Sequence, residues 1–385
     1  MYRLVREECP VQISATGVLA SAAPGTKRAV LTFPSVLALA DGSLLATLRA
    51  GSSKDSADET IELFQSQDGG VSWQQLGILS HDQPIEGAYG SLKVCYLSEI
   101  APGHVLAAAM WIDRSSYPGK PLFNNETEGC LPMLILLAES IDRGLHWSPW
   151  RVVPMPADIG PASLTSPLIR LVDGALAISI ETNKAYYDAA PWMQRVVLFR
   201  SHDGGHSWGS PITAGEDPSG RIFNWDQRVG HAPDGRLGAF IWTYDSATQT
   251  YLNIHRRISA DGGRNWSRAE DLGFADQAGR PAVLRDGRVV LPWVDRFGTG
   301  TICVRLAADI AGQFDPASEV VLYSLRTRSA ERHNDTTGAL LAEMGLWTFG
   351  LPFAELLPNG EVLIVYYAGS EVAMDIHWTR MQIEP

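Results

Sequence analysis

The sequence predicts an all-β fold, a six-bladed β-propeller of four-stranded antiparallel blades, from three observations. An eight-residue pattern with Ser, Asp and Trp at fixed positions occurs four times. A hairpin of two apolar strands around a tight turn occurs six times, at intervals that leave room for four strands each. The apolar segments between turns are five to eight residues long, which is too short for the helices of a solenoid.

Each copy of the eight-residue pattern ends one apolar run and begins another, so it is predicted to form a tight turn. The Asp carboxylate accepts backbone N–H groups, the glycines permit positive φ, and the Trp buries its ring between layers. One such turn is weak evidence because Asp-Gly hairpins are common, but four copies with Trp at the same offset indicate an internal repeat. The copies are SQDGGVSW (66–73), SIDRGLHW (140–147), SHDGGHSW (201–208) and SADGGRNW (259–266).

The six hairpins set the number of blades, although blades five and six lack the repeated turn. The N-terminal segment YRLVREE (2–8) is expected to add an outer strand to the last blade, which ends in DIHWTRMQI (375–383). This pairing would join the two ends of the chain and make residues 1–385 one domain. The hairpin turns lie at Asp41, Pro102, Asp173, Asp234, Asp286 and Asn359.

Composition and charge exclude several classes of function. The 385 residues carry a formal charge of −12, which disfavours binding to nucleic acid or to an anionic membrane. The four cysteines are scattered, so free thiols are expected rather than a zinc site or a disulfide framework. The N-terminus has no apolar signal segment, which predicts a cytoplasmic protein. No metal or organic cofactor is implied, and the oligomeric state is left open.

Blade topology predicts where a site would lie. If each blade runs from its innermost strand outward, the hairpins and the repeated turns share one face, and the start of strand one and the end of strand two reach the other. Charged and aromatic residues concentrate at that second face, which suits a carbohydrate pocket. The residues predicted there are Arg49, Asp55, Asp58, Asp113, Arg114, Glu181, Asn183, Asp226, Arg228, Trp242, Tyr244, Asp245, Arg280, Trp293, Asp295, Arg296, Tyr366 and Tyr367. A secondary group, Arg332, His333, Asn334 and Asp335, lies in the segment 326–347, which departs most from the strand pattern and is a candidate to overhang the pocket.

The repeated SxDGGxSW turns, combined with hairpins of the form PSVLALADGSLLATLRAG, resemble the sialidase (neuraminidase) superfamily, whose Asp-box or BNR repeats mark six-bladed propellers. The resemblance covers nearly the whole chain. It implies a glycoside hydrolase with its site on the propeller axis and a carbohydrate substrate. One fold hosts many activities, so the residues must decide the function.

The chain departs from sialidases at two hallmarks. The first of the three arginines that hold the substrate carboxylate in that family is Thr32 here, in Leu31-Thr32-Phe33-Pro34. The tyrosine nucleophile that opens the last blade is absent, because the matching segment is Gly350-Leu351-Pro352. Arg49 and the acidic loop SSKDSADE resemble the family's arginine and acid/base Asp. These departures favour a related glycosidase over a true sialidase with an arginine triad.

Glycosidic cleavage needs one carboxylic acid and a second group that attacks the anomeric carbon or activates water. Asp58 or Asp55 is the predicted acid, and Glu181 the predicted base or nucleophile, because Glu181 ends an otherwise apolar strand. Asp226 and Asp295 are reserves for the role of Glu181. The predicted substrate contacts are Arg49, Arg228, Arg280, Arg296, Asp295, Trp242, Tyr244, Tyr366 and Tyr367.

Structural roles are the alternative for many of these residues. The loop with Asp55 and Asp58 is polar throughout and is also expected as a solvated acidic loop, while Arg49 also suits a salt bridge between blades. Arg228 and Arg296 each follow an acidic residue closely and suit ion pairs. Tyr366 and Tyr367 alternate across a strand, so only one can face the axis. Trp242 and Trp293 also suit packing between blades.

Two other functions stay open at this point. A propeller polysaccharide lyase acting on uronates would use a Tyr or His base and an arginine-neutralised carboxylate. A non-catalytic glycan-binding propeller would explain the missing sialidase residues.

Overall fold

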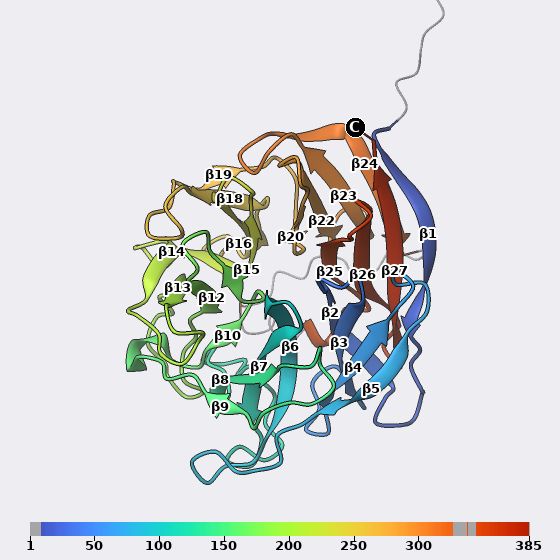
Figure 1. The fold of residues 1–385 in the computed structure, drawn as a ribbon. Helices are drawn as coiled ribbons and strands as arrows, with labels where there is room; N and C mark the ends of the chain where they lie inside the picture. Colours follow the sequence, from blue (N-terminus) through green and yellow to red (C-terminus); the bar gives the residue numbers. More distant parts are fainter. Residues whose placement is uncertain (1–8, 326–336, 338–343, 385) are drawn as a thin grey trace, which may run out of the picture.

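The computed structural model describes residues 9–325, 337 and 344–384, and its strands form a ring of sheets around a central axis (Figure 1). The strand ladders fall into six four-stranded antiparallel sets, which confirms the predicted fold class. The short 3-10 turns η1 (Ala157–Ile159) and η2 (Met344–Leu346) are additional elements. No helix among the described residues has the length and apolar character needed to cross a membrane.

Each blade begins with the strand nearest the axis and ends with the strand at the rim. Blade one contains β2 (Val30–Ala38), β3 (Leu44–Gly51), β4 (Thr60–Ser66) and β5 (Gln74–Leu79). Blade two contains β6 (Gly90–Ala101), β7 (His104–Asp113), β8 (Met133–Ser140) and β9 (Arg151–Val152). Blade three contains β10 (Ser163–Leu164) with β11 (Ile169–Arg170), then β12 (Leu176–Glu181), β13 (Arg195–Ser201) and β14 (Ile212–Glu216).

The last three blades follow the same order. Blade four contains β15 (Ile222–His231), β16 (Leu237–Asp245), β17 (Thr250–Tyr251) with β18 (His255–Ser259), and β19 (Glu270–Asp271). Blade five contains β20 (Gln277–Ala278) with β21 (Ala282–Val283), then β22 (Val289–Asp295), β23 (Thr301–Ala307) and β24 (Phe314–Ser324). Blade six contains β25 (Phe349–Leu356), β26 (Val362–Ser370), β27 (Ala373–Ile383) and β1 (Val11–Ala20).

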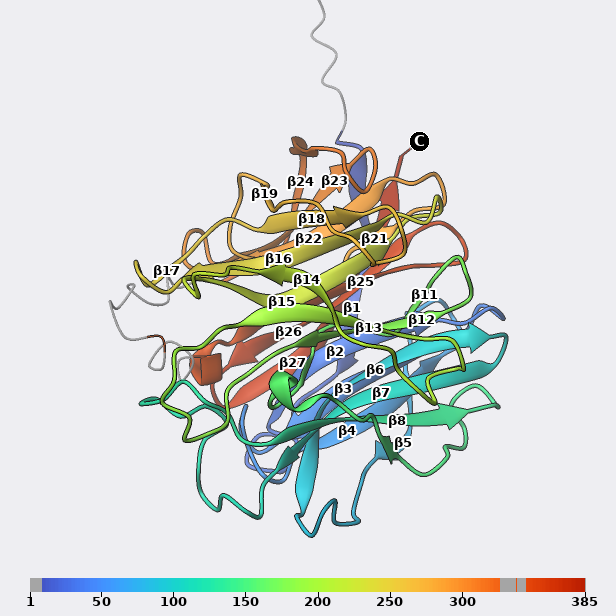
Figure 2. The same ribbon diagram turned by 90° about the vertical axis from the view of Figure 1, so that its left-hand side faces the viewer.

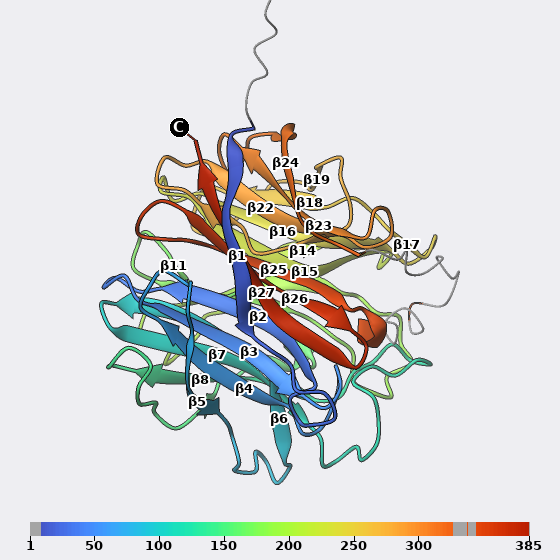
Figure 3. The same ribbon diagram turned by 90° about the vertical axis from the view of Figure 1, so that its right-hand side faces the viewer.

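The N-terminal strand closes the ring, as Figure 3 shows, where β1 runs along β27. β1 pairs antiparallel with β27 from Val11 opposite Ile383 to Ala20 opposite Ile376. The expected segment YRLVREE lies outside the described residues, and the strand that joins blade six is the following one. The chain then crosses to blade one, where Val30 of β2 bridges Met374 of β27 in parallel.

The repeated turns and the hairpin turns share one face of the ring, as the topology predicts. The strands run between two faces (Figure 2). On the face of the turns, Arg143 of the second repeated turn donates its backbone N–H to Gly103 O at 3.0 Å and pairs with Asp41 at 3.0 Å. Arg264 of the fourth repeated turn pairs with Asp173 at 3.3 Å. The opposite face therefore carries the ends of the second strands and the loops that follow them.

Hydrogen bonds inside each repeated turn explain its sequence. In the first copy Asp68 Oδ1 accepts the N–H groups of Val71 and Ser72 at 3.1 and 2.9 Å. The Ser66 hydroxyl donates to the same carboxylate at 2.8 Å, and the Trp73 indole donates to Gly70 O at 3.0 Å. The turn therefore satisfies its own backbone and holds the half-buried Trp against the sheet.

The fifth position of the repeated turn is glycine in all four copies, and its φ is positive in each. A Cβ on Gly70 would lie 2.9 Å from Leu363 Cδ2 of blade six, and φ is +88°. The fourth position is less restricted. Gly69 has φ +71° with its nearest neighbour at 3.7 Å, and the second copy places Arg143 at the matching position with φ +63°.

Gly70→Ala should therefore destabilise the protein more than Gly69→Ala. Both variants place a Cβ at positive φ, which costs about 1–2 kcal/mol, and Gly70→Ala adds overpacking of about 1–3 kcal/mol. Urea unfolding of both variants measures the difference. Equal losses in the two variants would contradict the packing argument. Activity should be unchanged in both, because this turn lies on the face away from the cavity described below.

Candidate active site

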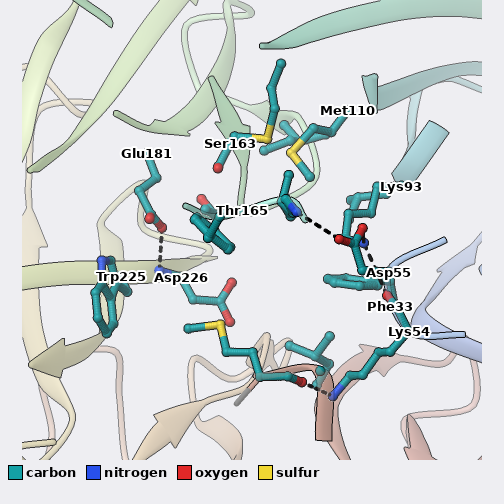
Figure 4. Close-up of a pocket in the computed structure, with 18 of the residues that line it drawn as sticks. Phe33, Lys54, Asp55, Lys93, Met110, Ser163, Thr165, Glu181, Trp225 and Asp226 are labelled. Carbon is teal, nitrogen blue, oxygen red and sulfur yellow. Dashed lines mark hydrogen bonds and ion pairs between the residues drawn. The ribbon is translucent and has the colours of Figure 1, made fainter. Parts of the chain in front are cut away.

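A cavity of about 640 Å³ lies where the inner strands meet, on the face opposite the repeated turns. Residues from all six blades and from the loops above them line it. Figure 4 shows Glu181, Trp225 and Asp226 on one side and Lys54, Asp55 and Lys93 on the other. The volume and the mixture of aromatic and polar walls are typical of a small-molecule site.

Interruptions in the innermost strands direct side chains into this cavity. The ladder between the first and second strands skips Phe33, Lys93, Asp226 and Leu351, and each of these residues lines the cavity. Three of them, Phe33, Asp226 and Leu351, have φ of 50°, 49° and 48°. Such left-handed residues cost about 1–3 kcal/mol each and persist only where the surroundings fix them. Thr165, between β10 and β11, lines the cavity in the same way.

Glu181 and Asp226 form the first polar group of the cavity. Glu181 ends β12, is 9% exposed, and accepts the backbone N–H of Asp226 at 2.9 Å through Oε2. Burial, together with the nearby Asp226 charge, raises the pKa of Glu181 to about 8. The Asp226 carboxylate is ion-paired with Arg228 at 2.6 Å and accepts Gln277 Nε2–H at 2.8 Å. A buried carboxyl group of raised pKa thus lies beside a carboxylate that is ion-paired with an arginine.

Arg228 positions the carboxylate of Asp226 in this group. Its guanidinium is buried and donates to the Tyr96 hydroxyl at 2.8 Å and to Thr165 O at 2.6 Å. Burial lowers the pKa of Arg228, but the Asp226 charge, the Tyr96 hydroxyl and the hydrogen bonds to both residues together raise it above its ordinary value. Arg228 lines the cavity, but its donors are largely committed to protein partners.

Asp55 belongs to a second, cationic group on the opposite wall. Its carboxylate contacts Arg114 at 2.7 Å and Lys93 at 3.3 Å, and it accepts the Leu122 N–H at 2.9 Å. Burial alone would raise the pKa of Asp55, but Lys93 and Arg114 outweigh burial and hold it well below its ordinary value. Asp55 is therefore an ionised, immobilised carboxylate and a poor proton donor.

Glu59 forms ion pairs with three cations, two of which also pair with Asp55. Its side chain is fully buried and contacts Arg49 at 2.6 Å, Arg114 at 2.6 Å and Lys93 at 3.4 Å. Burial opposes ionisation, but these three cations lower the pKa of Glu59 to about 2. The Arg49 guanidinium is fully buried in this group and does not line the cavity. Its ion pair with Glu59 lies within blade one, and Glu59 makes the contacts to Lys93 and Arg114 of blade two.

Lys54, Arg296 and Tyr367 form a third group where blades five, six and one meet. Lys54 Nζ donates to Met344 O, Trp347 O and the Tyr367 hydroxyl at 2.8, 2.7 and 2.9 Å. Arg296 stacks on the Trp347 ring at 4.0 Å. Burial, and then repulsion by Arg296, Lys93 and Arg49, holds the pKa of Lys54 well below its ordinary value. Lys54 has no carboxylate partner among the described residues.

The structure brings together about half of the predicted site residues. Of the predicted catalytic and substrate-contact residues, those that line the cavity are Asp55, Glu181, Asp226, Arg228, Arg296, Trp242 and Tyr367, and the six that do not are Arg49, Asp58, Tyr244, Arg280, Asp295 and Tyr366. Of the further residues predicted at this face, Arg114 lines the cavity, whereas Asp113, Asn183, Asp245 and Trp293 do not. The secondary candidates Arg332, His333, Asn334 and Asp335 lie outside the described residues. The nearby described residues Met344, Gly345 and Trp347 do line the cavity.

Each of the other residues outside the cavity has a local structural contact. Asp58 accepts Ser52 N–H at 3.1 Å within its loop. Arg280 pairs with Glu355 at a second, smaller hollow, and Asp295 accepts the N–H groups of the 298–299 turn. Tyr244 stacks on Trp225 with ring centroids 4.8 Å apart, and Tyr366 donates its hydroxyl to Leu322 O at 3.3 Å. Tyr367 alone of the tyrosine pair faces the axis, as strand alternation predicts.

The sequence interpretation missed several cavity residues. Lys93, Phe33 and Thr165 occupy matching positions in the inner strands of blades two, one and three, so aligning the six inner strands would have identified them. Lys54 and Gln277 carry no such signal, because Lys54 lies in a loop and Gln277 in the two-residue strand β20. The tryptophans Trp192, Trp225 and Trp347 complete an aromatic wall that sequence patterns cannot distinguish from core.

No protein-family model matches the sequence, and no curated protein matches it. Solved structures resemble the fold. One is a protein of unknown function from Dyadobacter fermentans, with TM-score 0.73 and 19% identity over 97% of this chain and 100% of that chain. The intramolecular trans-sialidase of Ruminococcus gnavus has TM-score 0.62 and 16% identity, over 95% and 98% of the two chains. The α-L-arabinanase of Penicillium chrysogenum has TM-score 0.60 and 15% identity, over 97% and 99%. The chain therefore shares the overall fold of these solved structures.

Removing the buried charge of Glu59 should destabilise the protein strongly. Glu59→Gln leaves Arg49, Lys93 and Arg114 without their shared carboxylate, which costs about 3–5 kcal/mol in urea unfolding at neutral pH. The wild-type stabilisation is present above the ordinary Glu pKa and is lost as pH falls towards 2, so the difference between the proteins should shrink with acid.

The matched control is Asp234→Asn, which removes the exposed ion pair with Arg236. Exposed pairs contribute about 0–1 kcal/mol. A loss at Glu59 no larger than that at Asp234 would contradict the central role of Glu59.

Proposed function

We propose that the protein is a glycoside hydrolase that removes a terminal sugar bound in the axial cavity. The main support for this proposal is the pair formed by Glu181 and Asp226. Glu181 is a buried carboxyl group of raised pKa, and Asp226 beside it is a carboxylate that is ion-paired with Arg228. Two carboxyl groups whose surroundings separate their protonation states are the requirement for glycosidic cleavage.

The charges assign roles that reverse the sequence interpretation of Glu181. With a pKa of about 8, Glu181 is protonated at neutral pH and acts as the general acid. It donates its proton to the glycosidic oxygen as the bond from that oxygen to the anomeric carbon breaks. Asp226, held by Arg228 and Gln277, attacks the anomeric carbon or takes a proton from the attacking water. Asp55 is ionised, and Asp58 lies outside the cavity, so neither serves as the acid.

Uncompensated cations indicate an anionic group on the sugar. The described lining includes six cationic side chains, Lys54, Lys93, Arg114, Lys120, Arg228 and Arg296, against three acidic ones, Asp55, Glu181 and Asp226. Lys93, Arg114 and Arg228 are neutralised by carboxylates. Arg296 lies 3.8 Å from Asp276, whose pKa burial raises to about 6, so this carboxyl group is largely ionised at neutral pH and offsets part of the charge of Arg296. An anion placed near Lys54 and Arg296 would relieve their repulsion.

The lyase alternative has less support from these groups. It needs a tyrosine or histidine that loses a proton readily. Burial raises the pKa of Tyr367 to about 12, and no histidine is among the described residues that line the cavity. Hydrolysis by two carboxyl groups therefore fits the cavity better.

Glu181→Gln should abolish hydrolysis while the protein stays folded, because Gln keeps the shape of Glu but has no acidic proton. The expected loss in kcat is about 10²–10⁴-fold. Wild-type activity that depends on the Glu181 proton should fall as pH rises through about 8. The measurement is turnover of aryl glycosides of sialic acid, uronic acids, pentoses and hexoses across pH.

A stability measurement accompanies this activity test. A raised carboxyl pKa contributes stability that is complete below the ordinary Glu pKa and is lost as pH rises towards about 8. Glu181→Gln should therefore remove a fall in stability between about pH 4.5 and pH 8. Full activity of the variant would remove Glu181 from the mechanism, and glycan binding without turnover by the wild type would favour the non-catalytic alternative.

Lys54→Met should raise KM for substrates with an anionic terminal sugar about tenfold or more and leave neutral substrates little affected, since one charge contact is lost. Lys120→Met is the matched control, because Lys120 also lines the cavity but is exposed. Steady-state kinetics with paired acidic and neutral aryl glycosides measures the effect. Equal changes for both substrate classes would indicate that Lys54 acts only through packing.

A further inference from the structure

Three tyrosines form a ring cluster at the mouth of the cavity, apart from the groups described above. Tyr117, in the loop after β7, lines the cavity, and Tyr186 and Tyr187 follow β12. The ring centroids of Tyr117 lie 5.5 Å from Tyr186 and 6.1 Å from Tyr187, and Tyr186 meets Tyr187 edge-on at 5.1 Å. Tyr186 is buried, but Tyr187 is 64% exposed. The cluster therefore runs from the cavity wall to the surface.

Hydrogen bonds between the loops of blades two and three hold this cluster in place. Asn124 Nδ2 and the Thr127 hydroxyl both donate to Tyr186 O, at 2.9 and 2.6 Å. The Cys130 N–H donates to Lys184 O at 3.0 Å. A Cβ on Gly129 would lie 2.1 Å from Ala185 O, so the two loops are in close backbone contact. The exposed ring is thus presented on a rigid support.

A rigid, exposed tyrosine is suited to a sugar ring. Tyrosine offers a large apolar face with a hydroxyl at one edge, and it loses little conformational entropy on binding. Carbohydrates present apolar C–H faces bordered by hydroxyls, so they match such a surface. The cluster is continuous with the cavity through Tyr117, and a glycan whose terminal sugar fills the cavity must leave through the mouth.

We propose that Tyr187 and Tyr117 bind the sugar on the leaving-group side of the scissile bond, so that the substrate is an oligosaccharide chain. This inference rests on the proposed function for the position of the terminal sugar. The glycan that continues from the cavity stacks on the exposed Tyr187 ring, while Tyr117 contacts it where it leaves the cavity. The cluster then selects for a sugar as leaving group.

Kinetics with two leaving groups test this subsite. For the most rapidly cleaved terminal sugar, kcat/KM is measured for its glycosyl fluoride, which cannot reach Tyr187, and for a tetrasaccharide ending in the same sugar. Tyr187→Ala should lower kcat/KM for the tetrasaccharide roughly 3- to 30-fold and leave the fluoride within about twofold. Tyr187→Phe should keep most of the tetrasaccharide activity, since it keeps the ring.

Tyr89→Ala is the matched control, because Tyr89 is 59% exposed and has no ring contact within the described part of the chain. It should leave both substrates unchanged. Equal losses for fluoride and tetrasaccharide in Tyr187→Ala, or no loss for either, would overturn the subsite while leaving hydrolysis standing.

A binding measurement separates failure of the subsite from failure of the proposed function. Tetrasaccharides that end in sialic acid, a uronic acid, arabinose or a neutral hexose are titrated calorimetrically into wild type and Tyr187→Ala. Binding without turnover that weakens in Tyr187→Ala would support the tyrosine site and reject hydrolysis. Binding that is indifferent to Tyr187, or no binding of any tetrasaccharide, would overturn the subsite.

Discussion

The site depends on one constraint. The hydrogen-bond ladders between the first and second strands of the blades are interrupted at the level of the cavity. At that level the ladders skip Phe33, Lys93, Asp226 and Leu351, and their side chains enter the cavity instead. The cost of the left-handed backbone at three of these positions is met by regular pairing on either side. The pairing of β1 with β27 keeps the ring closed, so the interruptions keep fixed positions relative to one another.

The charges of the cavity follow from where each carboxyl group finds its partners. Asp55 and Glu59 lie among Lys93, Arg49 and Arg114, and these cations keep both ionised despite burial. Burial dominates the pKa of Glu181 and outweighs the backbone N–H of Asp226 and the charge of Arg228, which both lower it. Burial and nearby cations therefore shift the pKa of Glu59 and the pKa of Glu181 in opposite directions, and this difference distinguishes the carboxyl group that we propose as the acid.

The fold could be predicted from the sequence because its signals are local and repeated. The Asp, Gly and Trp of the repeated turns determine their own hydrogen bonds, and their spacing sets the blade register. That register also placed Glu181, Asp226 and Tyr367 at the correct face. It could not separate Arg49 from Arg228, because the partner of Arg49 is Glu59, which lies in the loop before β4 and whose position depends on the path of that loop. Arg280 was misplaced for a similar reason, since its partner Glu355 lies in the neighbouring blade.

The sequence could not predict whether Glu181 would act as an acid or as a base, for a further physical reason. A carboxyl group at a strand end becomes an acid or a base according to the balance between burial and nearby cations, and both terms come from other blades. The nearest cation, Arg228, is drawn to Asp226 at 2.6 Å and is further committed to Tyr96 and Thr165. Glu181 is left with burial as the dominant influence on its pKa. Arg228, which the sequence suggested as a substrate contact, thus pairs with Asp226 rather than with Glu181.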